Sequence, residues 1–193
     1  MKEIINSMIT IHSQEDFEKM RIAGKLAAET LDFITAYVKA GVTTNELDKL
    51  CHDFIMNAGA IPAPLGYRGY PKSICTSKNH VVCHGIPDDI PLKEGDILNI
   101  DVTVILDGWH GDTSRMYCVG DVPIRALRLC KAAYEALMIS IEQVKPGKKF
   151  NEIGRTIENY IKPYSFSIVR DYCGHGLGKV FHAPPNIAHF YDP

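Results

Sequence analysis

The spacing of hydrophobic residues along the chain changes between two periods. Apolar side chains that recur every three or four positions predict helices, because this spacing gathers them on one helical face. The four segments with this spacing are residues 14–40, 44–58, 123–144 and 150–162. Other apolar segments have the composition and spacing of strands. These are residues 73–84, 97–106 and 164–173, and a loop dense in Pro and Gly spans residues 60–72.

Polar residues and glycines mark where the helices begin and end. Ser13 followed by Asp16 is a helix start signal, and a threonine at 43 or 44 caps the second helix. Gly41 and Gly59 end the first two helices. Residues 1–14 are expected to form a lead-in strand or arm, and residues 174–193 are expected to carry no clear element.

Residues 95–117 predict a β-hairpin with an unusual pair of acids. Asp107-Gly108 suits a two-residue type I′ turn, which needs positive φ at both central positions. In that register Thr103 lies opposite Asp112, provided that no bulge intervenes. Side chains alternate between faces along a strand, so Asp101 shares a face with Thr103 and is the diagonal neighbour of Asp112.

Two neighbouring carboxylates repel each other when they are buried. Either one of the pair holds a proton, or a cation lies between them. Carboxylate oxygens suit divalent metals, and paired metals about 3.5–4 Å apart are common in hydrolases. The alternative is a solvated edge hairpin whose acids point to water.

An internal repeat relates the two parts of the chain at an offset of 106 residues, which predicts a duplicated α/β half. Asn45-Glu46-Leu47 corresponds to Asn151-Glu152-Ile153, and Phe54-Ile55 corresponds to Tyr160-Ile161. We expect one domain over residues 1–193, with a first half at about 15–120 and a second half at about 121–193. The second half then lacks a counterpart of residues 88–120, so we expect the chain to be a fragment.

Composition narrows the class of protein. The chain has 193 residues, 46% of them hydrophobic, and a formal charge of −2. This balance gives no reason to expect nucleic acid or an anionic membrane as partner. The apolar segments are shorter than the ~20 residues of a membrane helix, and the N-terminus lacks signal-peptide features, so a cytoplasmic protein is expected. Six cysteines without a CxxC pair argue against a structural zinc site of that type.

Histidines in glycine-rich surroundings are the further candidates for chemistry. His175 lies between two glycines, and His182 follows it by seven positions. His84 is a third candidate, and the remaining histidines are expected to be surface or satisfied residues, with His110 the least certain because it shares the face of Asp112. A Cys83–His84 nucleophile remains open as an alternative. No phosphate-binding loop has the required spacing.

Four ordered motifs resemble type I methionine aminopeptidases, which have the duplicated pita-bread α/β fold with pseudo-twofold related halves. The motifs are residues 66–73 (GYRGYPKS), 82–87 (VCHGIP), 99–103 (NIDVT) with 111–114 (GDTS), and 174–178 (GHGLG) with 181–182 (FH). The short arm before residue 14 resembles the bacterial form. The resemblance implies a metallopeptidase that removes the initiator methionine from new proteins.

The same resemblance implies the site residues. Asp101, Asp112 and His175 match three of the family's five metal ligands, which hold two divalent ions of cobalt, manganese, iron or zinc. The other two ligands are glutamates, expected beyond Pro193, so weak metal binding and doubtful activity are expected of a chain that ends there. His84 and His182 match the catalytic, substrate-binding histidines. The methionine pocket is implied to contain Tyr67, Tyr70, Cys75 and Phe181, with Pro64 where relatives often have cysteine.

Two alternatives come from the same fold. A metal-free pita-bread module that binds other molecules would be expected to lose the acids or histidines. An X-Pro aminopeptidase, prolidase or small-amidine hydrolase is disfavoured by the loop at residues 66–67 and by the short N-terminus. The expected partners are nascent polypeptide N-termini near the ribosome, with no nucleic acid or membrane, and the expected state is a monomer.

Overall fold

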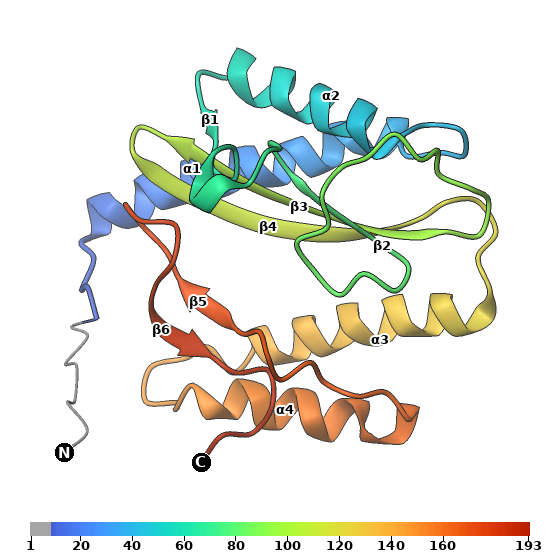
Figure 1. Ribbon diagram of the computed structural model, residues 1–193. Coiled ribbons are helices and arrows are strands. Elements are labelled where there is room, and N and C mark those ends of the chain that lie inside the picture. Colours follow the sequence, from blue (N-terminus) through green and yellow to red (C-terminus); the bar gives the residue numbers. More distant parts are fainter. Residues whose placement is uncertain (1–8) are drawn as a thin grey trace. The chain divides into compact units, whose positions relative to one another are not determined.

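The computed structural model describes residues 9–193, so most of the expected arm at residues 1–14 lies outside the described residues. The chain divides into two compact units (Figure 1). The N-terminal unit contains Ile11–Pro123 together with the short segment Leu177–Phe181. The C-terminal unit contains Ile124–Gly176 and His182–Pro193. The domain assignment made from the sequence stays a prediction.

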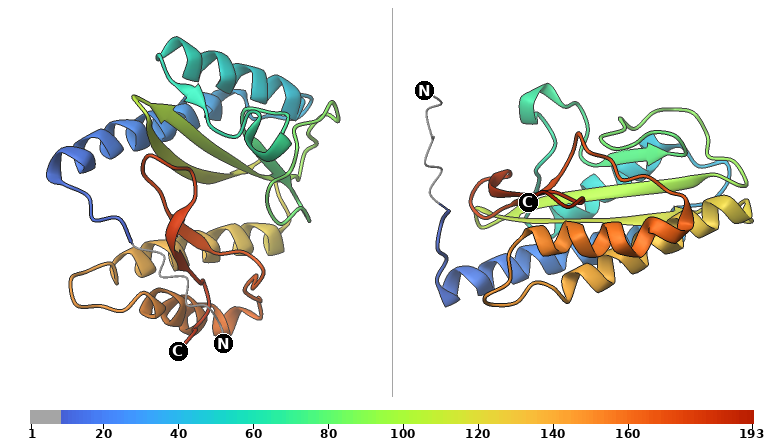
Figure 2. Two further views of the ribbon diagram at one scale, coloured as in Figure 1. Left: turned by 60° about the vertical axis from the view of Figure 1, so that its left-hand side comes forward. Right: turned by 90° about the horizontal axis from the view of Figure 1, so that it is seen from below.

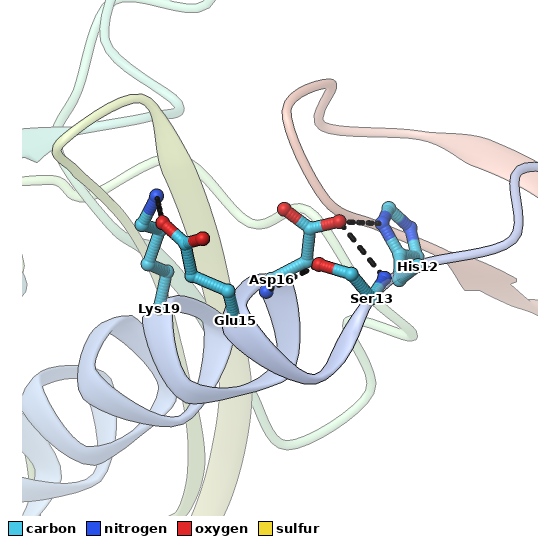
Figure 3. A network of polar contacts seen from close by, with 5 residues as sticks. All are labelled: His12, Ser13, Glu15, Asp16 and Lys19. Atoms are coloured by element: carbon cyan, nitrogen blue, oxygen red, sulfur yellow. Dashed lines mark hydrogen bonds and ion pairs between the residues drawn. The ribbon is translucent and has the colours of Figure 1, made fainter.

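Helix α1 (Gln14–Ile34) begins where the sequence predicts. Asp16 N–H donates to Ser13 Oγ at 3.2 Å, and the Asp16 carboxylate accepts from Ser13 N–H at 2.9 Å, so the two residues cap the helix reciprocally (Figure 3). The predicted end at residue 40 was too late. The Thr35 hydroxyl donates to the Leu31 carbonyl at 2.8 Å, and the chain tightens there into the 3₁₀ turn η1 (Thr35–Tyr37).

Helix α2 (Thr44–Asn57) starts after Thr43, which forms the same reciprocal cap with Glu46. The loop predicted at residues 60–72 contains two short elements, β1 (Ile61–Pro62) and the 3₁₀ turn η2 (Tyr67–Gly69). The strand predicted at residues 73–84 is only β2 (Cys75–Lys78). It ends because Asn79 adopts positive φ and turns its side chain to Asp96 and to the Ile97 N–H.

The predicted hairpin is confirmed in the bounds of its first strand, in its turn and in its register. Strands β3 (Ile97–Leu106) and β4 (Trp109–Cys118) are antiparallel and joined by Asp107 and Gly108, whose φ angles are 50° and 79°. β1 and β2 pair with the other edge of β3. Helix α1 packs on one face of this sheet (Figures 1 and 2). Residues at even positions of β3 point into the core on that face, to which α2 also contributes side chains. The side chains fully buried there are Leu98, Ile100, Val102 and Val104.

Glycine at position 111 lets α1 approach the hairpin closely. A Cβ added to Gly111 would lie 2.3 Å from the backbone of Ala23, far inside van der Waals contact. We therefore expect Gly111→Ala to lower the free energy of unfolding by about 3 kcal/mol or more, because overpacking of a rigid backbone contact is not relieved by a rotamer change. Urea unfolding followed by circular dichroism measures this.

Gly24→Ala is the matched control, since Gly24 lies on the same helix with no atom within 4 Å of an added Cβ. It should stabilise the chain by about 0.5–1 kcal/mol through helix propensity. An unfolding free energy for Gly111→Ala equal to that of the unaltered chain would mean that α1 does not pack on β4 at this distance.

The C-terminal unit is built on the helix pair α3 (Ile124–Ile141) and α4 (Asn151–Ile161), as predicted from the spacing (Figure 2). The strand predicted at residues 164–173 was wrong. A 3₁₀ turn η3 (Lys162–Tyr164) is followed by irregular chain, and the strands are β5 (Gly174–Gly176) and β6 (Ala183–Ile187). A Cβ on Gly176 would lie 2.5 Å from the Pro184 carbonyl oxygen. Strands β5 and β6 therefore pair through close contact of their backbones, and not through a pattern of alternating side chains.

The repeat positions of the two helix pairs differ in burial. Leu31 on α1 is 2% exposed, whereas its counterpart Leu137 on α3 is 52% exposed. Leu137 lines an apolar groove of about 360 Å³ between α3, α4 and residues 166–169.

A helix with the length and apolar composition needed to span a membrane is absent from residues 9–193.

Candidate metal centre

The polar face of the hairpin carries the two acids. Asp101 lies opposite Ser114, and Thr103 lies opposite Asp112, as the two-residue turn predicted. Asp101 and Asp112 are therefore diagonal neighbours across β3 and β4, and their carboxyl groups are within hydrogen-bond reach. Both residues are half-buried.

This arrangement is electrostatically costly without a cation. Burial, followed by repulsion from the Asp112 carboxylate, raises the pKa of Asp101 to about 7. In residues 9–193, no lysine or arginine forms an ion pair with Asp101 to relieve the repulsion. A divalent ion between the carboxylates would relieve it, so the donor set fits a metal.

Strand β2 places a thiol beside the acids. Cys75 is the register partner of Asp101, so their side chains lie on the same face of the sheet. Burial raises the pKa of the Cys75 thiol to about 11, which keeps it neutral at pH 7 and makes it an apolar wall. The Tyr70 hydroxyl contacts Cys75 and also lies 2.9 Å from the Gly85 carbonyl oxygen, to which it donates.

His84 is exposed and has a φ of 54°, an uncommon conformation for a residue other than glycine. The backbone beside it is held against β2. Thr76 N–H donates to the Gly85 carbonyl at 2.8 Å, and a Cβ on Gly85 would lie 2.1 Å from the Thr76 carbonyl oxygen. The loop of His84 is thus fastened to the strand that pairs with Asp101.

The segment Leu177–Phe181 brings aromatic contacts to the N-terminal unit. The Phe181 ring lies 4.8 Å from that of Tyr67 and stacks at 5.7 Å on His110. Two of the four predicted pocket residues, Tyr67 and Phe181, are thereby in contact, and the other two, Tyr70 and Cys75, contact each other. His110 is only 7% exposed, and its burial could be anticipated only from its place on the face of Asp112.

The other two candidate histidines belong to the C-terminal unit. The rings of His175 and His182 lie 4.3 Å apart. His175 Nδ1 is 3.0 Å from the Gly176 carbonyl oxygen. Because a carbonyl only accepts, Nδ1 carries the proton, and Nε2 keeps the lone pair that a metal ligand requires. Within residues 9–193, no group of three or more His, Cys, Asp or Glu side chains is assembled as a metal site.

Comparison with known proteins gives consistent matches. The model of Metallopeptidase family M24 matches residues 18–193. The chain is 64% identical over 182 residues to the methionine aminopeptidase of Rickettsia prowazekii, a match that covers 94% of this chain and 70% of that protein. The methionine aminopeptidase of Escherichia coli K12 is 55% identical over 184 residues, with the same coverage.

Solved structures give the same grouping. The crystal structure of the Rickettsia prowazekii methionine aminopeptidase matches with a TM-score of 0.94 at 63% identity, over 96% of this chain and 75% of that one. The Thermotoga maritima methionine aminopeptidase has a TM-score of 0.93 at 33% identity, with the same coverage. The prolidase of Pyrococcus furiosus, at 21% identity and a TM-score of 0.81, covers 95% of this chain and 53% of that one and shares the fold alone.

Proposed function

Because the chain belongs to metallopeptidase family M24, and within it to the methionine aminopeptidases, we propose that it removes the initiator methionine from new polypeptides with divalent metal ions. The observation that carries the proposal is the pair of carboxyl groups on β3 and β4. Burial, together with repulsion from the Asp112 carboxylate, raises the pKa of Asp101 to about 7, and a cation would remove that repulsion.

Three side chains of this chain are proposed to hold the metal. Asp101 and Asp112 supply carboxylate oxygens, and His175 supplies Nε2, a mixed donor set that suits manganese, iron, cobalt or zinc. Two ions are proposed, as the resemblance implies. When bound, they would supply a hydroxide nucleophile near neutral pH and polarise the scissile carbonyl group.

The remaining candidates are proposed to bind and orient the substrate. Tyr67 and Phe181, which contact each other, and the pair of Tyr70 and Cys75 offer aromatic rings and a neutral thiol to the methionine thioether. His182 would donate a hydrogen bond to the substrate peptide as charge develops on its carbonyl oxygen. His84 would contact the substrate near the scissile nitrogen.

The relatives separate this function from its alternatives. The chain is 64% and 55% identical to the methionine aminopeptidases of Rickettsia prowazekii and Escherichia coli K12, but only about 20% identical to prolidases of the same fold. The acids and histidines that a metal-free binding module could lose are all present. Action on nascent chains near the ribosome, a cytoplasmic location and a monomeric state belong to the same proposal.

A peptidase assay tests the function. We expect release of methionine from Met-Ala-Ser in manganese or cobalt, loss of release in excess EDTA, and no release from acetylated Met-Ala-Ser, because a blocked amine is not an N-terminus. The assay should use both the 193-residue chain and a form continued past Pro193, where the two further glutamates are predicted. Absence of turnover by the continued form in every divalent metal would contradict the proposal.

Calorimetric titration separates the two forms. The 193-residue chain should bind manganese weakly, since three ligands give a more weakly held ion than five. Tight binding of two ions by the 193-residue chain would show that the predicted glutamates are not needed.

A further inference from the structure

His110 joins two parts of the N-terminal unit that are far apart in sequence. Its backbone N–H donates to the Gly178 carbonyl oxygen at 2.8 Å, and its ring Nδ1 lies 2.9 Å from the same oxygen. A carbonyl oxygen carries no proton, so Nδ1 must donate as well. One residue of β4 thus supplies both donors to a single acceptor, and the imidazole is buried, which makes the bond costly to lose.

The segment Leu177–Phe181 has further contacts that agree with a fixed position. A Cβ on Gly178 would lie 3.1 Å from the His12 ring and 3.7 Å from Trp109, so only glycine allows this close approach without adjustment. The Lys179 ammonium lies over the Trp109 ring at 5.3 Å from its centre. The Phe181 ring stacks on the His110 imidazole itself.

We call the two hydrogen bonds from His110 to the Gly178 carbonyl the His110 anchor. Its position along the chain indicates what it could affect. Gly176 and His175 directly precede the segment, and His182 directly follows Phe181. His110 lies two positions before Asp112 on the same strand. The hydrogen bonds of His110 therefore fasten the piece of chain between the two candidate histidines to the strand that carries a candidate acid.

We propose that His110 is a positioning residue, which holds the segment Leu177–Phe181 on β4 through the Gly178 carbonyl. By doing so it holds the Phe181 ring against Tyr67. It also fixes the position of the residue that directly precedes His182. This role rests on the proposed function, because it is through Phe181 and His182 that the anchor would affect methionine binding and turnover. The imidazole touches no reacting atom in this role.

Two substitutions of His110 distinguish the contribution of its Nδ1 donor from that of its aromatic ring. His110→Phe keeps a flat ring for Phe181 but removes the Nδ1 donor. His110→Asn places an amide N–H near the position of Nδ1 and removes the ring. If the donor to Gly178 is what matters, the asparagine variant should rescue what the phenylalanine variant loses. His52, whose Nδ1 contacts Ser73 Oγ at 2.8 Å elsewhere in the same unit, provides matched controls in His52→Phe and His52→Asn.

Trp109 gives a readout that needs no activity. It is the single tryptophan of the chain, it is 3% exposed, and Lys179 covers its ring. In the metal-free 193-residue chain, the acrylamide quenching constant of its fluorescence should rise at least about twofold in His110→Phe, because a segment that keeps only the backbone hydrogen bond uncovers the ring more often. His110→Asn and both His52 variants should stay close to the unaltered chain.

Kinetics of an active form give the second readout. His110→Phe should lower kcat/KM for Met-Ala-Ser by about tenfold or more, with changes in both kcat and KM, because small displacements of positioned groups reduce turnover strongly. His110→Asn should remain within about threefold. A variant that is only less stable would show a smaller active fraction and an unchanged KM.

Several results would overturn the proposal. These are unaltered quenching in a folded His110→Phe, equal impairment of His110→Asn and His110→Phe, or the same quenching change in His52→Phe. If His110→Phe does not fold, the folded asparagine variant decides, and a twofold rise in its quenching constant counts against the anchor. Because quenching is measured without substrate, failure of the peptidase proposal remains distinguishable from failure of this one.

Discussion

Replacing Asp101 with asparagine is expected to stabilise the metal-free protein above pH 7 while abolishing metal-dependent peptidase activity. The stabilising effect arises because the ionised Asp101 carboxylate is buried beside Asp112, whereas an amide of the same shape carries no charge. The activity is lost because an amide is a far weaker metal ligand than a carboxylate. A substitution that raises the free energy of unfolding but abolishes activity is expected at a residue whose role is to bind the metal.

The pH dependence follows from the raised pKa of Asp101. The folded chain keeps the Asp101 proton up to about pH 7, whereas the unfolded chain releases it near pH 3.8. The folded state therefore binds more protons between these values, and the free energy of unfolding falls as pH rises through this window. The loss is complete above about pH 7, where a pKa difference of about three units corresponds to up to about 4 kcal/mol. The Asp101→Asn variant should lack this loss.

Urea unfolding in EDTA at pH 5 and pH 8 measures the effect. We expect the variant to be more stable than the unaltered chain by about 2–4 kcal/mol at pH 8, and by less at pH 5. Asp96→Asn is a matched control of opposite sign. Burial raises the pKa of Asp96, but hydrogen bonds from the Asn79 side chain and the Lys93 N–H outweigh it, so its net pKa is lowered. Asp96→Asn should destabilise. A destabilised Asp101→Asn at pH 8 would mean that the acids are not in repulsive contact.

Asp112→Asn is expected to lower kcat/KM of an active form by more than 100-fold while the chain keeps its fold. Loss of an outer-shell partner of a metal ligand costs about 10- to 100-fold, and loss of a charged ligand itself should exceed that. The same substitution removes the repulsion that helps to raise the pKa of Asp101. That pKa should therefore fall below 7 in the metal-free chain, although burial still holds it above its usual value.

Peptide hydrolysis and a carboxyl titration by nuclear magnetic resonance check these two expectations. Asp107→Asn is the matched control, because it makes the same change on the same hairpin at an exposed turn position with a φ of 50°, which asparagine also adopts. Its activity should be close to that of the unaltered chain. Retention of full activity by Asp112→Asn would remove this residue from the proposed metal site.

Local chemistry made several elements predictable. The reciprocal cap of Ser13 and Asp16 depends on residues three positions apart, so it is visible in sequence and present in α1. The turn at Asp107-Gly108 sets the hairpin register, and register alone brings Asp101 and Asp112 to one face. The diagonal pair of acids was thus predicted from a two-residue turn and the alternation of side chains.

The errors fall where backbone contacts between distant residues decide the structure. Residues 164–173 have a composition suited to a strand but lack a partner strand, while β5 and β6 form from glycine, proline and histidine. The close approach of Gly176 to the Pro184 carbonyl cannot be predicted from the pattern of side chains along the sequence. Likewise, the sequence predicts Leu31 and Leu137 as equivalent repeat positions, yet one is buried and the other half exposed.

By itself, the sequence determined the helix starts, the hairpin register and the chemical kinds of the candidate ligands, because each depends on residues close together along the chain. Only the tertiary structure decided that burial and proximity raise the pKa of Asp101, and that His110 holds the Gly178 carbonyl sixty-eight residues away. The physical reason is the separation along the chain over which each interaction acts. Caps, turns and strand alternation act over a few residues, whereas desolvation and the satisfaction of buried polar groups depend on whatever the fold brings alongside.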